Sequence, residues 1–377
     1  MDELNQLLSE LVSINSINPD LVPGSPGEAE IARYIARWLE RADLEVEVAE
    51  PVPGRPNVVG IARGTGGGKT LLLNGHMDTV GVTGMSHPYE PVIKEGRLYG
   101  RGAYDMKCGL AACMIAIAEA RKDRLRGDVI FTAVMDEEYA SLGTMVLAER
   151  IHADAAIVAE STELQLILAH RGFVWLEIET TGRAAHGSRP DLGVDAIAKM
   201  GRVLVELEKL DQYLRSNPTH PLLASGSLHA SLITGGQELS SYPEQCHLSV
   251  ERRTLPGETP EKVEAELVGI VQDLQRSDPA FKAAVRRGID RSPLETPADA
   301  HIVKTIQDAA SKVLNHQLPI AGVPFWTDAA VLSAAGIPSL LFGPTGAGAH
   351  ATEEWVDLAS VKACADIYLK TAREFCN

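Results

Sequence analysis

Histidine and carboxylate side chains directly follow several short apolar segments of this chain. Residues 71–73 lead to His76 and Asp78, and residues 129–135 lead to Glu137 and Glu138. If such segments are parallel strands, their carboxyl ends meet at one edge of a sheet, where ligands bind. Taken one at a time, these residues also fit ordinary caps, turns and loops. Together they predict one polar rim, formed by His76, Asp78, Asp105, Glu137, Glu138, Glu160 and His350.

This combination of side chains indicates a metal centre. Carboxylates crowded at the mouth of one sheet repel each other and are costly to desolvate unless cations neutralise them. Histidine and carboxylate ligands without cysteine suit a catalytic zinc, or cobalt or manganese, with open positions for water. Two Zn²⁺ ions would balance three carboxylates and one bridging hydroxide. The sequence therefore predicts two Zn²⁺, with Co²⁺ or Mn²⁺ as possible substitutes.

The glycine-rich stretch before the first of these segments has a competing interpretation as a phosphate-binding loop. Gly68-Lys69-Thr70 would then require glycine at position 63, which is Arg63. The apolar residues 71–73 that follow are too few for the helix that such a loop needs, and they indicate a buried strand. A serine hydrolase is also disfavoured because the chain has no Gly-x-Ser-x-Gly sequence. The five cysteines form no CxxC pair, so neither a thiolate zinc site nor a disulfide framework is indicated.

Composition excludes several classes of partner. The chain has 377 residues, with 51 acidic against 35 basic side chains and a net charge of −16. Such a surplus of negative charge argues against a nucleic-acid or anionic-membrane partner. No apolar run approaches the ~20 residues needed to span a bilayer, and the N-terminal residues are acidic and amphipathic, unlike a signal peptide. We therefore expect a cytoplasmic protein.

The length and the pattern of apolar residues predict two domains. The fold class is α/β, with a doubly wound, mostly parallel sheet in a metal-binding catalytic domain at residues 1–168 and 289–377. Between residues 169 and 288 the pattern changes to a β-α-β-β-α-β order, which is that of a ferredoxin-like domain inserted into the first. In the catalytic domain we predict a helix at 28–41 and strands at 45–49, 57–61, 71–73, 129–135, 155–159 and 339–342.

Seven short motifs then resemble those of a known family, the acetylornithine deacetylase, succinyl-diaminopimelate desuccinylase and aminoacylase metallohydrolases. The resemblance extends over nearly the whole chain and keeps the order of the motifs in the family. The motifs are Gly75-His76-Met77-Asp78-Thr79-Val80, Gly100-Arg101-Gly102-Ala103-Tyr104-Asp105-Met106-Lys107, Asp136-Glu137-Glu138, Gly182-Arg183-Ala184-Ala185-His186, Arg253-Thr254-Leu255-Pro256-Gly257, Thr327-Asp328-Ala329, and Gly343-Pro344 leading to His350.

The resemblance implies which residues would bind each of the two metals and which would assist them. Asp105 would bridge the two metals, and the Asp105-Met106 peptide bond is often cis in the family. Glu137 would be the general base that takes a proton from the metal-bound water and passes it to the leaving amine. Asp78 would accept the second ring N–H of one histidine ligand and fix its orientation. The remaining ligands would be His76 and Glu160 at one metal, and Glu138 and His350 at the other.

The resemblance also implies that the inserted domain is a lid and dimerisation domain. His186 would stabilise the developing oxyanion, in dimeric relatives from the partner subunit, and Arg253 would hold the substrate carboxylate. The chain departs from the family at Ser240, where relatives usually have asparagine, and at Ser161-Thr162, where relatives often have Pro-Thr. Ser240 would therefore bind substrate differently, and neither change affects a metal ligand.

The activity implied is hydrolysis of the amide bond of N-acyl amino acids by a zinc-dependent amidohydrolase, through a hydroxide that bridges the two metals. A dipeptidase, carboxypeptidase or aminopeptidase acting on small peptides with a free carboxylate is the alternative within the same chemistry. A noncatalytic binding protein on the same fold is disfavoured, because it should have lost ligands or the base, and all of them are present.

Overall fold

The computed structural model describes residues 2–377 and divides the chain into two compact units. Unit 1 comprises the chain up to Leu168, Thr296–Ala321 and Thr327–Asn377. Unit 2 comprises Ala169–Glu295 and Gly322–Trp326. The boundary predicted at residue 288 falls within strand β12 (Lys282–Arg291), and unit 2 continues beyond that strand. Among the described residues, no helix has the length and hydropathy needed to cross a membrane.

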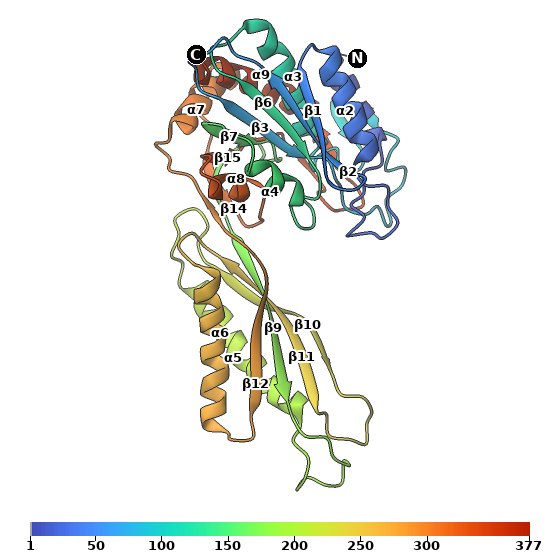
Figure 1. Cartoon of the computed structure of the whole chain (residues 1–377), viewed down its shortest axis with the longest axis vertical. Helices are drawn as coiled ribbons and strands as arrows, with labels where there is room; N and C mark the ends of the chain where they lie inside the picture. The colour runs from blue at the N-terminus through green and yellow to red at the C-terminus, as the bar shows by residue number, and fades with distance from the viewer. Residues whose placement is uncertain (1) are drawn as a thin grey trace. The chain divides into compact units, whose positions relative to one another are not determined.

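A nine-stranded sheet forms the centre of unit 1, with the order β1-β2-β6-β3-β7-β15-β8-β13, and β14 pairs with β8 (Figure 1). Its edge strand β13 and the last residues of β8 and β14 fall within the bounds of unit 2. The four central strands, β6, β3, β7 and β15, are parallel to one another. The pairs β1-β2, β2-β6 and β13-β8 are antiparallel. The predicted α/β class with a mostly parallel central sheet is confirmed. The strands are β1 (Glu45–Val52), β2 (Arg55–Ala62), β3 (Leu71–His76), β6 (Val129–Val134), β7 (Ala155–Val158), β8 (Leu166–His170), β13 (Leu294–Glu295), β14 (Ile320–Val323) and β15 (Ser339–Leu341).

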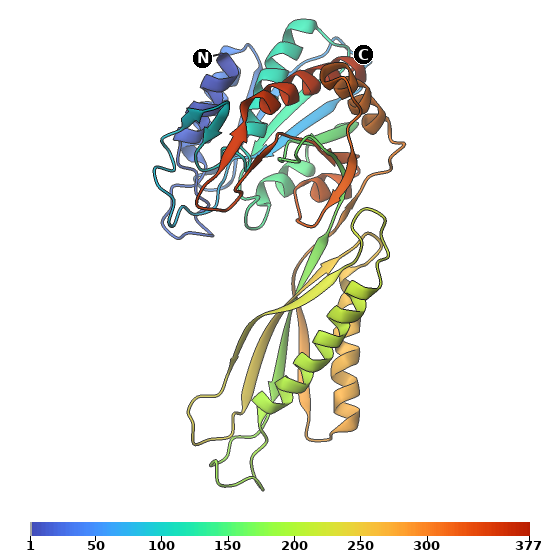
Figure 2. The same ribbon diagram turned by 180° about the vertical axis from the view of Figure 1, so that it is seen from behind.

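The central strands β3, β6 and β7 are buried along their whole length because both faces of the sheet are covered. Leu71 and Leu73 belong to the main core of unit 1, and Leu72 is equally buried but points to the other face. Figure 2 shows α9, in dark red, lying across one face of the sheet. Helices α4 and α8 pack together, and α8 contacts β7 and β15. The helices of unit 1 are α1 (Glu3–Ser13), α2 (Ala29–Arg41), α3 (Lys107–Asp123), α4 (Leu142–Ala148), α7 (His301–Leu314), α8 (Ala329–Ala334) and α9 (Leu358–Phe375).

A close approach between α3 and the end of β7 depends on one glycine. A Cβ atom at Gly109 would lie 2.1 Å from the main-chain oxygen of Ala159, so any other residue there would force the two segments apart. This contact brings the beginning of α3, which follows Asp105, to the end of β7, which precedes Glu160. The glycine thereby helps to position two predicted metal ligands.

A small four-stranded sheet joins two loops of unit 1 that are distant in sequence. Its order is β16-β17-β5-β4, and β17 pairs antiparallel with β5 through Trp355 opposite Tyr99. Strand β5 leads into the loop that carries Asp105, and β16 and β17 flank the loop that carries His350. The four strands are β4 (Val92–Lys94), β5 (Arg97–Tyr99), β16 (Gly346–Ala347) and β17 (Trp355–Asp357).

Unit 2 has a four-stranded antiparallel sheet with two helices, in the chain order β-α-β-β-α-β that the sequence predicts. Its central strands β9 and β11 alternate between buried and more exposed residues, so one face packs against the helices and the other carries the more exposed side chains. The sheet order is β10-β11-β9-β12, which places β10 and β12 at the edges. The other elements are β9 (Gly172–Thr181), α5 (Ala196–Ser216), β10 (Ser227–Gly235), β11 (Gln245–Thr254) and α6 (Pro260–Ser277).

Candidate metal centre

The carboxyl ends of three neighbouring parallel strands supply the first groups of the site. His76 is the last residue of β3, Glu137 and Glu138 follow β6, and Glu160 follows β7. Strands β6, β3 and β7 are adjacent in the sheet, so these side chains emerge along one edge. Two loops complete the set, with Asp105 before α3 and His350 between β16 and β17.

Asp105 lies between the two histidines and offers a separate oxygen to each. Its Oδ1 is 3.2 Å from Nε2 of His76, and its Oδ2 is 3.2 Å from Nε2 of His350. Oε2 of Glu138 is 3.1 Å from the same His350 nitrogen. One carboxylate therefore connects two groups of donors, as a ligand shared by two metal ions would. The Asp105-Met106 peptide bond is cis, as the family resemblance implies.

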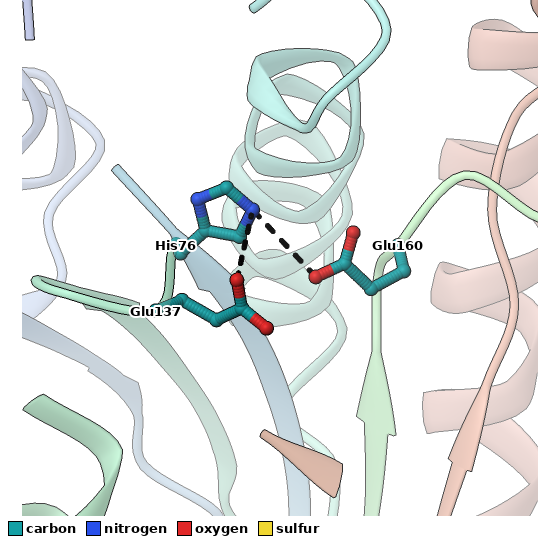
Figure 3. Close-up of side chains that lie close together, drawn as sticks. All are labelled: His76, Glu137 and Glu160. Atoms are coloured by element: carbon teal, nitrogen blue, oxygen red, sulfur yellow. Dashed lines mark ion pairs between the residues drawn. The ribbon is translucent and has the colours of Figure 1, made fainter. Parts of the chain in front are cut away.

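The other group of donors surrounds His76. Figure 3 shows Glu137 and Glu160 directed toward its ring from two different strands. Nε2 of His76 is 3.6 Å from Oε1 of Glu160 and 3.9 Å from Oε2 of Glu137. Both sets of three residues, His76 with Glu137 and Glu160, and His76 with Asp105 and Glu138, have ligand atoms within 4.8 Å of one another. Geometry alone therefore does not separate Glu137 from the ligands.

These donors fit divalent metal ions. Two ligands bound tetrahedrally at ~2.1 Å from one ion lie roughly 3.4 Å apart, close to the separations around Asp105. Oε1 of Glu138 is buried and has no hydrogen-bond partner among the described residues, an arrangement that is costly unless a cation approaches it. The site contains only imidazole nitrogens and carboxylate oxygens, a combination that suits zinc, cobalt or manganese.

Burial and neighbouring charges shift the pKa values of the groups in the site. Burial, reinforced by neighbouring carboxylates, raises the pKa of Glu160 to about 8 and holds the pKa of Glu137 well above its usual range. Hydrogen bonds to Asp105 and Glu138 raise the pKa of His350 to about 10. Burial opposes charge at Asp105 too, but the two histidine N–H groups hold the pKa of that carboxyl below its usual value. Bound cations would take the place of these protons, because metal ligands must be deprotonated.

Asp78 fixes the loop that carries Glu137 and Glu138. Its Oδ1 accepts a hydrogen bond from the main-chain N–H of Glu137, and its Oδ2 accepts one from that of Glu138, both at 3.1 Å. The Nδ1 atom of His76 lies 2.9 Å from the main-chain oxygen of Asp78 and 3.5 Å from its carboxylate. The main-chain oxygen is therefore the nearer acceptor for the ring N–H that the resemblance assigns to the carboxylate.

Further residues that support this loop were not predicted from the sequence. The amide of Asn18 donates to Oδ2 of Asp78 at 2.8 Å and to Oδ1 of Asp136 at 3.1 Å. Arg55 forms a two-point ion pair with the buried Glu28 and also contacts Asp136. These are contacts between distant parts of the chain, so no local motif could have revealed them.

A family comparison agrees with this geometry. The family described as Peptidase family M20/M25/M40 matches residues 72–374, which include every residue of the candidate centre. The chain belongs to this family. The predicted resemblance is thereby confirmed.

Two curated relatives and one solved structure are similar to this M20/M25/M40 chain over almost its full length. The acetylornithine deacetylase of Myxococcus xanthus is 30% identical, with 99% of this chain and 97% of the relative covered. The N-formyl-4-amino-5-aminomethyl-2-methylpyrimidine deformylase of Bacillus subtilis (strain 168) is 29% identical, with 100% and 95% covered. The aminopeptidase PepT structure from Bacillus cereus ATCC 10987 has a TM-score of 0.82 at 20% identity, with 99% and 98% covered, and supports the fold.

Three predicted substrate-binding residues of the M20/M25/M40 chain lie in unit 2. His186 is exposed, and its Nδ1 is 2.8 Å from Oγ of Ser188. Ser240 is also exposed. It lies close to His186, since its main-chain oxygen accepts a hydrogen bond from the N–H of Gly187. Arg253 lies over the ring of Phe173 and pairs with Glu251. Their roles stay predictions.

Proposed function

We propose that the protein is a dinuclear metal-dependent hydrolase that cleaves the amide bond of N-acyl amino acids. The observation that carries this proposal is Asp105, whose two oxygens face His76 and His350 separately at 3.2 Å. A carboxylate shared in this way suits two cations held side by side. The acetylornithine deacetylase relative supports an acyl amino acid as the substrate class.

The proposed cations are zinc, with cobalt or manganese as substitutes. When bound, they would polarise the amide carbonyl and lower the pKa of a water molecule. Asp105 would contact both ions. His76 and Glu160 would complete one site, and Glu138 and His350 the other. The His350 side chain is 55% exposed, so this end of the centre is open to an incoming substrate.

Glu137 is the proposed general base. It lies beside the predicted ligands, with Oε2 at 3.9 Å from Nε2 of His76, within reach of a water molecule held at the metals. It would take the proton of the attacking water and deliver it to the leaving nitrogen. Asp78 would keep Glu137 in place through the main-chain hydrogen bond described above.

Unit 1 is the proposed metal-binding catalytic part, and unit 2 the proposed lid and dimerisation part. His186 would donate a hydrogen bond to the oxyanion of the tetrahedral intermediate, an interaction that is typically worth ~3 kcal/mol of barrier. Arg253 would hold the carboxylate of the substrate with its planar guanidinium group. Ser240 would contact the substrate with a shorter side chain than the asparagine expected in the family.

A panel of substrates tests the proposed activity. The zinc-loaded protein should hydrolyse N-acetyl or N-succinyl amino acids and lose this activity in the presence of a chelator, and added zinc or cobalt should restore it. The C-terminal carboxamides of the same substrates should react with a kcat/KM lower by at least about tenfold, because Arg253 would lose its charged partner. Product amine released per minute is the measurement.

The panel also contains the competing substrate classes. Dipeptides and tripeptides test the peptidase alternative, to which the aminopeptidase structure belongs by name. An N-formyl amine without a carboxylate tests the chemistry in the name of the deformylase relative. Hydrolysis confined to peptides or to the formyl amine would contradict the proposed substrate class, and indifference to chelators would contradict the metal centre.

We also propose that unit 2 mediates a homodimer. Strand β10 is an edge strand, so one side of its backbone is unpaired within the described chain, and such an edge readily pairs with another strand. Leu232 and Ile233 on this strand are 70% and 52% exposed. Val205 of the adjacent helix α5 is exposed as well. An apolar edge of this kind favours a second copy of the same chain as its partner.

Replacing Leu232 by Lys should weaken the dimer by about tenfold or more, because a charge would have to be buried at the strand edge. Sedimentation over a range of concentrations is the measurement. Val92→Lys is the matched control, since Val92 is 55% exposed on the edge strand β4 of unit 1 and should leave association unchanged. If His186 reaches the partner's site, as in dimeric relatives, the monomeric variant should also lose turnover. A wild-type protein that is monomeric throughout would contradict the proposal.

The proposed substrate is a small molecule, and neither a nucleic acid nor a membrane is proposed as a partner. A cytoplasmic location stays a prediction from composition.

A further inference from the structure

The side chain of Glu354 is fully buried, although no step of the proposed reaction uses it. It lies four residues after His350, directly before β17, and its side chain has no exposed area. It forms an ion pair with Arg101, which is 3% exposed. A buried carboxylate is costly unless all of its acceptor positions are satisfied. Its hydrogen-bond partners therefore indicate what it does.

Glu354 accepts hydrogen bonds from the loop that carries Asp105. Its Oε1 accepts the main-chain N–H groups of Tyr104 and Asp105 at 2.9 and 3.0 Å. Its Oε2 accepts the main-chain N–H of Gly102 at 3.0 Å and the guanidinium of Arg101 at 2.6 Å. One carboxylate thus determines the path of the chain up to and including the backbone of Asp105.

The same pair also connects the loop of His350 and the loop after Asp78. Nη2 of Arg101 donates to the main-chain oxygen of Ala351 at 2.9 Å and to that of Gly81 at 3.1 Å. The main-chain N–H of Gly100 donates to the main-chain oxygen of Glu354 at 3.1 Å. Three loops that carry groups of the candidate centre therefore meet at this ion pair.

We infer that Glu354, together with Arg101, is a positioning residue that sets the distance between Asp105 and His350. It would thereby set the affinity of the second metal site, which is the one that Glu138 and His350 would complete. The inference rests on the proposed dinuclear centre. His350 and Asp105 lie on loops without long regular structure, so their separation depends on the hydrogen bonds between those loops. Loss of a residue that holds a metal ligand in place by hydrogen bonds typically costs 10–100-fold in metal affinity.

Glu354→Gln is the decisive variant because it keeps the shape of the side chain. A glutamine amide has one acceptor oxygen and one NH₂ group. In either orientation, two of the four donors that now reach Glu354 would face another donor. We expect the affinity for the second zinc ion to fall by about 10–100-fold, and by more than the affinity for the first ion falls, because both ions would share Asp105 but only the second would also depend on the loop of His350. Competition titration with a chromophoric chelator measures both affinities, and the visible spectrum of the cobalt-loaded protein reports the change in ligand geometry.

Glu258→Gln is the matched control for a loss of stability alone. Glu258 pairs with the buried Arg252 at 2.6 Å and accepts the main-chain N–H of Leu255, but it belongs to unit 2. Both variants should melt at a lower temperature than the wild type when free of metal. Only Glu354→Gln should lose affinity for the second zinc.

Three outcomes decide the inference. Two zinc affinities within about twofold of the wild type in Glu354→Gln would overturn it, and so would an equal loss in Glu258→Gln. If Glu354→Gln is not recovered folded, Arg101→Lys replaces it, because lysine cannot reach the carboxylate and both main-chain oxygens at once. A wild-type protein that takes up no zinc would overturn the proposed function and this inference with it, whereas normal uptake with an unchanged variant overturns the inference alone.

Discussion

Replacing Glu137 by Gln is expected to lower kcat by about 10²–10⁴-fold, the usual contribution of a general base. The variant keeps the size and the hydrogen-bonding oxygen of the side chain but cannot accept a proton. The main-chain N–H of Glu137 would still donate to Asp78, so the loop should keep its position. Initial rates with an acyl amino acid, together with metal analysis of the same sample, are the measurements.

The metal content of this variant separates two roles for Glu137. Its Oε2 is 3.9 Å from Nε2 of His76, within the range of the ligand groups. If Glu137 is the base, the variant should retain about two zinc ions per chain with little turnover. Loss of one zinc would instead make it a ligand, and full activity would remove it from the mechanism altogether.

Changing Asp105 to Asn is expected to have the other largest effect, a loss of about one metal ion per chain and at least a ~10³-fold fall in kcat/KM. Asparagine offers one oxygen, and its NH₂ group would point toward the place of a cation. One of the two groups of donors would therefore lose its shared ligand. The loss of one Lewis acid costs several kcal/mol of barrier, and each 1.36 kcal/mol is a tenfold change in rate.

Asp43→Asn is the matched control for Asp105→Asn. Asp43 is an exposed residue that pairs with Arg121 at the surface of unit 1. The Asp43→Asn variant should retain both metal ions and normal turnover. Retention of two tightly bound ions by the Asp105 variant would show that the carboxylate is not shared between them.

The central strands and the polar residues at their ends could be predicted from the sequence because a short apolar run and the polar residues that end it mark the same position. A strand buried on both faces is apolar without alternation, and residues such as His76 and Glu160 interrupt that pattern where the strand ends. The alternating strands and amphipathic helices of unit 2 were equally visible. Strand β8 was missed because it adjoins the change of pattern at residue 169, where the sequence was divided.

The residues that hold the loops of the predicted metal ligands in place could not be predicted from short apolar runs. Asn18 and Glu354 act on groups that are 60 and about 250 residues away, and most of the groups that Glu354 binds are main-chain N–H groups. Almost every residue has the same main-chain N–H group, so the sequence does not show which of these groups a side chain will bind. The four strands of the small sheet were not predicted either, because segments of two or three residues are too short to show a periodicity.

The pairing of β9 with β12 brings the two ends of the inserted segment together. Phe173 near the start of β9 lies opposite Arg291 at the end of β12, so the insert begins and finishes at neighbouring points. In the host unit, the N–H of Thr296 donates to the oxygen of Leu168 at 2.8 Å, so the two cut ends also adjoin. A segment whose ends adjoin can be replaced by a short connection. A turn from Leu168 to Thr296 would therefore leave all five predicted metal ligands in unit 1.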